Sequence, residues 1–306
     1  MDKVGQSGDP DFVIAGAQKS ATTFASSVLN NISGVHVEPG ELPWLESPYY
    51  EAGGADRIRY RLRGSTSAKV MGFKRANYFT AVGVAERLSV EFPYADVVII
   101  LRDPVSRAFS ATLHYMEYGH IPFEDPNIAL TKLLDGRDQG AARAWEILEW
   151  GRYRKYAIEY SNAIGADRLH FVDQSKLVSN PVDVLRTIPS LHDIAAPDSV
   201  PARTNVGSTG LADLWLRRKM HQALTGHDLS TGRLLPRTQN PVRLGVGYAW
   251  KTANRVRTQF AVGESRPVSI NPDVAARLAE FYSPDIEYAR IALGIQFRNK
   301  SNGDAP

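Results

Sequence analysis

The sequence contains no cysteine, and it has no apolar run long enough for a membrane-spanning helix. The absence of cysteine excludes disulfide bonds, thiolate catalysis and any zinc site built on cysteine ligands. The absence of about 18 consecutive apolar residues argues against a transmembrane helix. The first ten residues also lack a basic segment followed by an apolar one, so we expect no secretory signal and predict a cytoplasmic protein.

A large excess of charge is also missing, because 36 lysines and arginines face 33 acidic residues, for a formal net charge of +3. This balance suits a small anionic ligand and does not favour nucleic acid, which calls for basic residues clustered on one face. The nearest cluster holds arginines at alternating positions, namely Arg57, Arg59, Arg61 and Arg63. We interpret it as a solvated surface segment, and the alternative is that it grips an anionic acceptor.

The chain has 306 residues, of which 43% are hydrophobic and 23% charged, as in ordinary globular proteins. This length suffices for one large α/β domain. We predict a single domain over 1–306, with a nucleotide-binding core at about 11–180, C-terminal helices and loops at about 195–295, and flexible ends.

Short apolar strands alternate with helical patterns along the chain. Residues 97–101 are the strongest strand signal, because all five are apolar and four are β-branched. The expected strands are 12–15, 35–37, 70–73, 97–101 and 169–172. The expected helices are 22–31, 84–92, 104–118, 141–163, 175–177, 181–188 (the longer of these last two), 211–224, 272–282 and 284–293, with loops at 195–210 and 225–247. This alternation predicts a P-loop-like three-layer α/β fold, a central parallel sheet flanked by helices.

The first expected strand leads into a loop of small residues, Gly16-Ala17-Gln18-Lys19-Ser20-Ala21-Thr22-Thr23, and then into a helix. A strand, a tight loop and a helix N-terminus form an anion site, because free backbone N–H groups and the helix dipole point at the ligand. The loop differs from the nucleotide-triphosphatase pattern, since Thr22 stands where that pattern has its lysine. Lys19 instead lies within the loop, where it can reach a phosphate without magnesium.

A second motif, Arg102-Asp103-Pro104-Val105-Ser106-Arg107-Ala108-Phe109-Ser110, follows the strongest strand. In open parallel sheets, ligands bind beyond the carboxyl ends of the strands. Arg102 lies at such an end, and Ser110 lies on the helix that follows. An arginine and a serine hydroxyl that converge there make a pocket for a phosphate dianion. A competing interpretation is that Asp103 belongs to a magnesium-binding kinase or hydrolase strand, but the matching lysine is missing.

These two motifs resemble those of sulfotransferases that use 3′-phosphoadenosine 5′-phosphosulfate (PAPS). The first resembles the 5′-phosphosulfate loop, usually Lys-Ser-Gly-Thr-Thr, with Ala21 in place of the glycine. The second resembles the 3′-phosphate motif, which assigns Arg102 and Ser110 to that phosphate and leaves Arg107 with either a binding or a structural role. Tyr153, in Gly151-Arg152-Tyr153, lies near the nucleotide or in the core. The cofactor-binding residues that the resemblance implies are Lys19, Ser20, Ala21, Thr22, Thr23, Phe24, Arg102, Ser110 and Tyr153.

The acceptor side resembles the carbohydrate-acting, heparan-sulfate-sulfotransferase-like branch, which has a Lys-Glu-x-x-aromatic stretch. Glu41, followed by Trp44, matches its catalytic base, although Gly40 replaces the lysine. Glu38 is the second candidate for the base and His36 the third. Lys74 matches a lysine in a second stretch of that branch, where it helps to bind acceptor or sulfonate.

The resemblance therefore implies in-line transfer of a sulfuryl group from PAPS to an acceptor hydroxyl, with Glu41 as base and with Lys19 and Lys74 as catalytic cations. We expect no metal and no nucleic-acid partner, and we predict a glycan or glycolipid acceptor, with an aromatic hydroxyl as the alternative. The oligomeric state is not predicted. Two other classes stay open, a P-loop kinase or nucleotide hydrolase and a non-catalytic module that binds adenosine bisphosphate. Asn205 resembles a family asparagine in a loop that closes over the nucleotide.

Overall fold

The computed structural model describes residues 8–64, 68–137, 143–197, 199–201, 210–225 and 268–297. Asn205 and the predicted loop beyond residue 225 lie outside these described residues. The chain divides into two compact units, one made of 1–107, 152–204 and 282–306 and the other of 108–151 and 205–281. We call the first the sheet unit and the second the helical unit, after the elements that they contain.

The sheet unit holds a five-stranded sheet in the order β2-β3-β1-β4-β5. The strands are β1 (Phe12–Gly16), β2 (Val35–Val37), β3 (Val70–Lys74), β4 (Asp96–Leu101) and β5 (Leu169–Asp173). Every neighbouring pair is parallel, so all carboxyl ends meet at one edge. The structure thus confirms the predicted strands and the α/β class.

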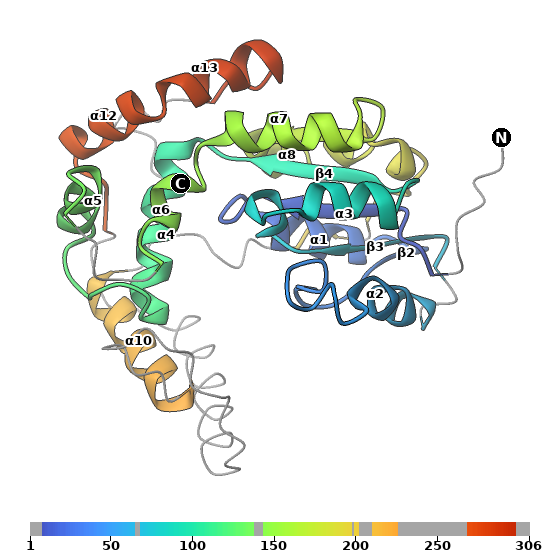
Figure 1. The fold of residues 1–306 in the computed structure, drawn as a ribbon, viewed down its shortest axis with the longest axis horizontal. Helices are drawn as coiled ribbons and strands as arrows, with labels where there is room; N and C mark the ends of the chain where they lie inside the picture. Colours follow the sequence, from blue (N-terminus) through green and yellow to red (C-terminus); the bar gives the residue numbers. More distant parts are fainter. Residues whose placement is uncertain are drawn as a thin grey trace. The chain divides into compact units, whose positions relative to one another are not determined.

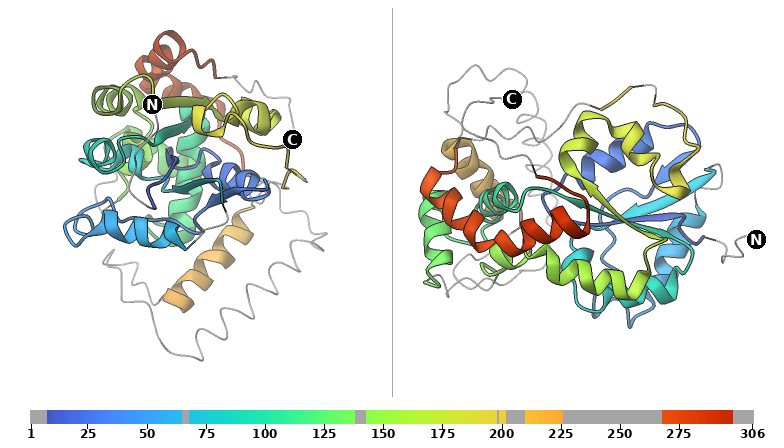
Figure 2. Two further views of the ribbon diagram at one scale, coloured as in Figure 1. Left: turned by 90° about the vertical axis from the view of Figure 1, so that its right-hand side faces the viewer. Right: turned by 90° about the horizontal axis from the view of Figure 1, so that it is seen from above.

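Helices cover both faces of this sheet, as the right-hand view of Figure 2 shows. One face carries α1 (Thr22–Asn30), α8 (Gln174–Ser179) and α9 (Pro181–Leu185), and the other carries α3 (Val84–Glu91), α7 (Tyr153–Ile164) and α13 (Ser283–Ala292). The buried strands feed both cores because successive side chains alternate between faces. Val13 and Ala15 join the α7 side, whereas Phe12 and Ile14 join the α1 side.

The remaining elements of the sheet unit are α2 (Gly54–Arg63) and two short 3₁₀ turns, η1 (Tyr78–Thr80) and η2 (Pro189–Leu191). Among the described residues of the whole chain, no helix is both long and apolar enough to cross a membrane.

The described part of the helical unit holds five helices, which are labelled in Figure 1. They are α5 (Pro126–Leu134), α6 (Glu146–Glu149), α10 (Leu211–Thr225), α12 (Pro272–Phe281) and all but the first four residues of α4 (Pro104–Tyr118). Arg218 fixes α10 to the end of α4, since its Nη1 donates to the carbonyl oxygens of Met116 at 2.7 Å and Ile121 at 2.8 Å. Arg277 of α12 pairs with Asp135, the residue after α5, at 2.6 Å.

Some elements differ from the prediction. The expected helix 141–163 is divided into α6 and α7 at Gly151, where the chain turns. The segment expected as a longer helix at 181–188 forms only the five-residue α9. Two helices, α2 and α5, were not predicted.

The arginine cluster lies on α2, where Arg57, Arg61 and Arg63 are exposed as expected. Arg59 differs from the prediction, because it is only 7% exposed. Its Nε donates to Asp9 at 2.8 Å, and its Nη2 donates to the carbonyl oxygen of Glu91 at 2.7 Å. The alternating arginines did not indicate a helix. In the structure, Ile58, Arg59 and Leu62 all lie on the buried side of α2.

Candidate functional site

The loop after β1 lies at the carboxyl edge of the sheet and turns back on itself. The pairing of β1 with β4 shifts register between Ile14 and Gly16, at the point where the loop begins. The N–H of Ala17 donates to the carbonyl oxygen of Ile100 at 2.8 Å, and the N–H of Ser20 donates to Ala17 at 3.2 Å. The first bond holds the loop against β4, and the second closes a turn within the loop before it enters α1.

The N-terminus of α1 offers backbone donors. Its N-cap residue is Ala21, which has no side-chain acceptor. The N–H of Ala25 is bonded to the carbonyl oxygen of Ala21 at 3.0 Å, which closes the first turn. The amides of Thr22, Thr23 and Phe24 come before that turn, where a helix has no internal acceptor for them. They can therefore bind an anion, and the helix dipole favours negative charge there.

Two polar side-chain atoms in this loop are buried without a partner in the described part of the chain. They are the Oγ of Ser20, a residue that is 0% exposed, and the Oε1 of Gln18. A buried polar atom without a hydrogen bond costs roughly 1–3 kcal/mol, so such atoms are rare in folded proteins. The Ser20 hydroxyl can donate to a phosphate oxygen, which fits a loop that binds an anion.

Two residues of the loop have a backbone conformation that favours glycine, although neither is glycine. Lys19 has φ of 68° and Ala21 has φ of 65°, both in the left-handed region. Glycine adopts this region without cost, whereas other residues are strained there. Alanine in place of the glycine of the sulfotransferase motif is therefore a strained substitution.

Arg102 reaches the loop from the end of β4. Its Nη1 donates to the carbonyl oxygen of Lys19 at 3.3 Å. Its own carbonyl oxygen accepts a bond of 2.8 Å from the hydroxyl of Tyr153. The two motifs found in the sequence are thus joined directly in the structure.

Tyr153 is 0% exposed and packs between Phe79 and Phe297, at ring-centroid distances of 6.2 and 6.3 Å. Its burial raises the pKa of its hydroxyl well above the ordinary tyrosine value, so the hydroxyl stays a donor. This favours the core interpretation over direct contact with a nucleotide, because Tyr153 fixes the backbone of Arg102.

The remaining residues of the second motif lie on α4. Arg107 is fully buried and hydrogen-bonds Tyr282, which favours its structural role. The first segment of the sheet unit ends at Arg107. Ser110 lies three residues later and therefore belongs to the helical unit. Its part in phosphate binding stays a prediction.

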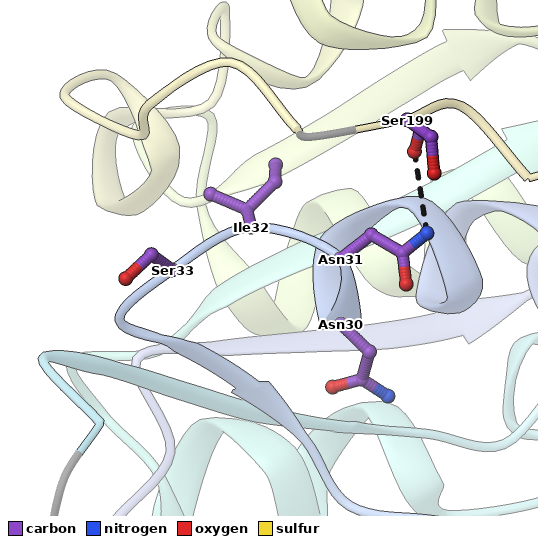
Figure 3. A pocket seen from close by; sticks show the side chains of 5 residues that line it. All are labelled: Asn30, Asn31, Ile32, Ser33 and Ser199. Atoms are coloured by element: carbon purple, nitrogen blue, oxygen red, sulfur yellow. Dashed lines mark hydrogen bonds between the residues drawn. The ribbon is translucent and has the colours of Figure 1, made fainter.

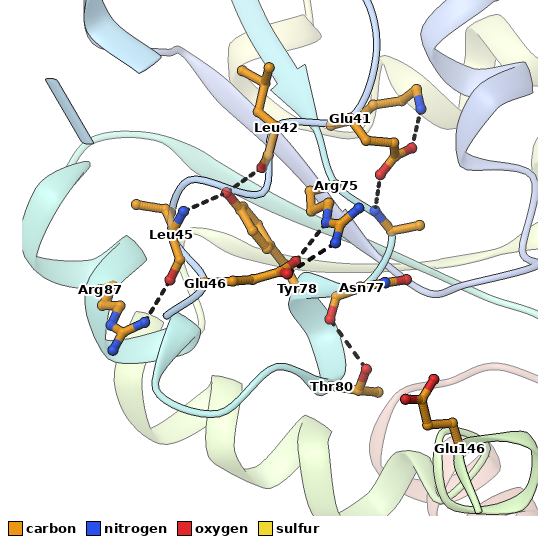
Figure 4. Close-up of polar contacts among 12 residues, drawn as sticks. Glu41, Leu42, Leu45, Glu46, Arg75, Asn77, Tyr78, Thr80, Arg87 and Glu146 are labelled. Carbon is orange, nitrogen blue, oxygen red and sulfur yellow. Dashed lines mark hydrogen bonds and ion pairs between the residues drawn. The ribbon is translucent and has the colours of Figure 1, made fainter. Parts of the chain in front are cut away.

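On the other side of β1, Glu41 and Lys74 form an ion pair (Figure 4). The Nζ of Lys74 donates to Oε1 of Glu41, and the backbone N–H of Ala76 donates to Oε2 at 2.9 Å. Lys74 is the last residue of β3 and stands in register with Ile14 of β1. The structure therefore brings together the predicted base and the predicted acceptor-side lysine.

The segment that carries Glu41, residues 41–46, is fixed by bonds that sequence reasoning missed (Figure 4). The hydroxyl of Tyr78 donates to the carbonyl oxygen of Leu42 at 2.5 Å and accepts from the N–H of Leu45 at 3.0 Å. Glu46 accepts two bonds from Arg75, at 2.6 Å from Nε and 3.0 Å from Nη2. The only sequence signal was the presence of Arg75 and Tyr78 in the stretch that contains Lys74.

The alternative bases are less exposed than Glu41. Glu38 is 5% exposed and accepts a bond from Nε of Arg61 at 2.7 Å. His36 lies beside the same carboxylate, with its Nε2 at 3.3 Å from Oε2. The side chain of Glu41 is 36% exposed, so of the three candidates it is the carboxylate best able to meet an acceptor.

A shallow pocket lies at the opposite end of α1, lined by Asn30, Asn31, Ile32, Ser33 and Ser199 (Figure 3). Asn31 closes one side of it by donating to the carbonyl oxygen of Ser199 at 3.2 Å. Because the phosphate loop lies at the N-terminus of α1, this pocket belongs to a different part of the sheet unit.

The three basic side chains of the site come from neighbouring strands. β1, β3 and β4 are adjacent in the sheet and parallel, so their carboxyl ends share one edge. Lys19 follows β1, Lys74 ends β3 and Arg102 follows β4. We call this group, together with Glu41 and the amides of 22–24, the edge site.

Comparisons with known proteins find similarity to sulfotransferases. The family model described as "Sulfotransferase family" matches residues 49–198, a span that contains Lys74 and Arg102. The bifunctional heparan sulfate N-deacetylase/N-sulfotransferase 1 of Caenorhabditis elegans is 26% identical over 198 residues, which cover 60% of this chain and 22% of that protein. The heparan sulfate glucosamine 3-O-sulfotransferase 3B1 of Mus musculus is 23% identical over 184 residues, which cover 58% of this chain and 45% of that protein.

The chain thus spans less than half the length of these curated relatives. Among solved structures, the crystal structure of a sulfotransferase from Alicyclobacillus acidocaldarius matches with a TM-score of 0.52 and 22% identity, and covers 73% of this chain and 98% of that one. This likeness shows a shared fold. The matching family model and the relatives show that about half of this chain or more is similar in sequence to sulfotransferases.

Proposed function

We propose that this protein transfers a sulfuryl group from PAPS to an acceptor hydroxyl, and that the acceptor is a carbohydrate or a glycolipid. The observation that carries the proposal is the Glu41–Lys74 pair on the same sheet edge as the phosphate loop. A base, a cation and an anion site on adjacent strands are the groups that a sulfuryl transfer needs.

The nucleotide half of the site accounts for both phosphate ends of PAPS. The amides of 22–24, the Ser20 hydroxyl and Lys19 face the 5′-phosphosulfate in this proposal. Arg102 and Ser110 bind the 3′-phosphate, which distinguishes PAPS from ATP. The buried Ser20 hydroxyl, which has no partner among the described residues, supports the first assignment. The contact of Arg102 with the Lys19 carbonyl supports the second.

The reaction that follows is a direct displacement at sulfur. The acceptor oxygen attacks the sulfur atom while Glu41 takes the acceptor proton, and the bond between sulfur and the bridging oxygen of the phosphate breaks. Adenosine 3′,5′-bisphosphate leaves with the electron pair of that bond. Lys19 and Lys74 stabilise the negative charge that develops on the bridging oxygen.

Lys74 also affects whether Glu41 can take the proton of the acceptor. Its ammonium group is hydrogen-bonded to Glu41. A carboxylate that accepts a hydrogen bond from an ammonium group with one of its oxygens is less available to take the proton of an acceptor hydroxyl. In our proposal, the sulfonate of PAPS draws Lys74 away from Glu41, so that the base becomes available when the co-substrate is bound.

The acceptor assignment is supported by the relatives, whose names describe heparan sulfate N- and 3-O-sulfotransferases. A chemically desulfated heparin is therefore a suitable first acceptor, because it offers both free hydroxyl and free amino groups.

Calorimetry without magnesium gives the first test. We expect adenosine 3′,5′-bisphosphate to bind tightly and ATP weakly. Binding of ATP only when magnesium is added, with no binding of the bisphosphate, would contradict the proposal and favour a P-loop kinase or hydrolase.

Turnover gives the second test, with desulfated heparin and PAPS as substrates and product detected by mass spectrometry. We expect Glu41→Gln to lower kcat roughly 10²- to 10⁴-fold, as loss of a general base does, while bisphosphate affinity is unchanged. Glu287→Gln is the matched control, because Glu287 lies in a surface ion pair on α13 and is 55% exposed. Equal rates for Glu41→Gln and the control would exclude Glu41 as the base.

A further inference from the structure

The turn at residues 74–76 supplies both hydrogen bonds that Glu41 receives in the described structure. Lys74 donates to one carboxylate oxygen and the backbone of Ala76 donates to the other. Arg75 stands between these two donors, so its conformation sets the direction of both.

Arg75 is anchored at its two ends. Its backbone N–H donates to the carbonyl oxygen of Ile14 at 3.0 Å, which ties the turn to the last part of β1. Its guanidinium binds Glu46 through two parallel bonds of 2.6 and 3.0 Å. Such fork-to-fork pairs fix the orientation of both partners more strictly than a single bond does.

The pair is also partly shielded from water. The side chains of Arg75 and Glu46 are 20% and 22% exposed. Burial lowers the pKa of Arg75, but the hydrogen bonds and the charge of Glu46 more than offset this effect and raise it above the ordinary value. Arg75 is therefore a permanent cation that holds the end of segment 41–46.

From this geometry we propose that Arg75 and Glu46 are positioning residues for the Glu41 carboxylate. Their ion pair closes a ring that runs from Glu41 along the chain to Glu46, across to Arg75, and back through Ala76 to Glu41. The inference rests on the proposed function in one respect only, that Glu41 is the base. The placement of Glu41 by Arg75 can be tested without any turnover.

The structural test is amide hydrogen exchange at Ala76, measured by NMR. The bond from Ala76 to Glu41 protects this amide. We expect Arg75→Gln and Glu46→Gln to speed exchange at Ala76 at least about tenfold, approaching the rate in Glu41→Ala, which removes the acceptor. Wild-type protection of Ala76 in both Gln variants would overturn the proposal.

The matched control is Arg290→Gln. Arg290 makes the same two-bond pair with Glu287, through Nε at 3.0 Å and Nη2 at 2.6 Å, on the exposed surface of α13. It should leave exchange at Ala76 unchanged. A rise in exchange in this control would mean that loss of any such pair loosens the protein generally, and would also count against the proposal.

Kinetics provide the second readout, with PAPS and desulfated heparin. A misplaced base costs turnover and leaves nucleotide binding intact, so we expect Arg75→Gln to lower kcat roughly 10- to 100-fold with the KM for PAPS unchanged. Arg75→Lys keeps the charge but loses the fork, and should rescue kcat only in part. A fall in PAPS affinity with unchanged kcat would show that Arg75 acts on the nucleotide instead.

The charge-swapped double variant Arg75→Glu/Glu46→Arg guards against misfolding. It restores an ion pair between the two positions, so Ala76 protection should return toward the wild-type rate. Failure of the swap to restore any protection, in a variant with wild-type circular dichroism, would contradict the positioning role. Absence of turnover in the wild-type protein would count against the proposed function alone, because the exchange experiment does not depend on it.

Discussion

The methyl group of Ala21 lies on a backbone with φ of 65°, at the N-cap of the helix that receives the phosphate group in our proposal. Left-handed backbone costs an alanine roughly 1–2 kcal/mol, and glycine avoids this cost. We therefore predict that Ala21→Gly raises the free energy of unfolding by about 1 kcal/mol. This net gain is smaller than the strain that is relieved, because glycine also increases the conformational entropy of the unfolded chain. Urea denaturation measures the difference.

The control for this prediction is Ala276→Gly. Ala276 is an exposed residue inside α12, where glycine costs about 1 kcal/mol relative to alanine. The two substitutions are chemically identical and should have opposite signs. A loss of stability in Ala21→Gly equal to that of the control would mean that Ala21 does not adopt the left-handed conformation.

Some residues of the edge site could be predicted from sequence because each lies inside a contiguous motif. Lys19 and Arg102 follow apolar strands, and both were identified from that position. The pair of Arg75 with Glu46 spans 29 residues, and its partners lie on the connections that follow the paired strands β3 and β2. No local pattern encodes such a contact, so the sequence did not reveal it.

At the scale of elements, the strands were the easiest to predict, since buried parallel strands are continuous apolar runs. The helix α2 was missed because its arginines at alternate positions mask the apolar positions Ala55, Ile58 and Leu62, which have helical spacing. The start of α5 did carry a signal, since Asp125 caps it by accepting the N–H of Asn127 at 2.7 Å and Pro126 opens it. Capping residues without a strong apolar stripe did not suffice for a helix prediction.

One buried carboxylate ties three elements together at the amino edge of the sheet. Asp96 of β4 is 3% exposed, lies 3.0 Å from Nε2 of His170 on β5, and accepts the N–H of Ser190 in η2 at 2.7 Å. Burial raises the pKa of Asp96, but the bonds from His170 and Ser190 outweigh it, so the pKa is lowered on balance.

This lowered pKa predicts a pH dependence of stability. The stabilisation is complete above the unfolded-state value of about 3.9 and is lost as the pH falls through the lower folded-state pKa. We expect Asp96→Asn to cost about 2 kcal/mol at pH 7, and the difference from wild type to shrink below about pH 4. Denaturation at a series of pH values tests this, with the exposed Asp167→Asn as a control that should stay within about 0.5 kcal/mol. A gap between Asp96→Asn and wild type that does not change with pH would contradict it.

At the scale of the whole molecule, the chain combines a sheet unit that carries most of the predicted site with a helical unit that carries Ser110. The single domain predicted from the sequence stays a prediction. The helical unit is assembled from two separate stretches of chain. Packing between α5 and α12, which are distant in sequence, defines that unit. Patterns read along the chain contain no information on such pairings.

Ligand binding gives a prediction for the stability of the whole protein. A ligand that binds only the folded state at 100 times its Kd stabilises that state by about 2.7 kcal/mol. We expect adenosine 3′,5′-bisphosphate to reach this value in urea denaturation at a concentration where adenosine 5′-monophosphate, which lacks the 3′-phosphate, gives much less. Arg102→Ala should reduce the effect of the bisphosphate to that of the monophosphate, and Ser110→Ala should reduce it in part. Each variant is compared with its own ligand-free form, because Arg102 also holds the carbonyl of Lys19. Equal stabilisation by the two nucleotides in the wild-type protein would mean that no group in this chain recognises the 3′-phosphate, and the assignment of Arg102 would fail with it.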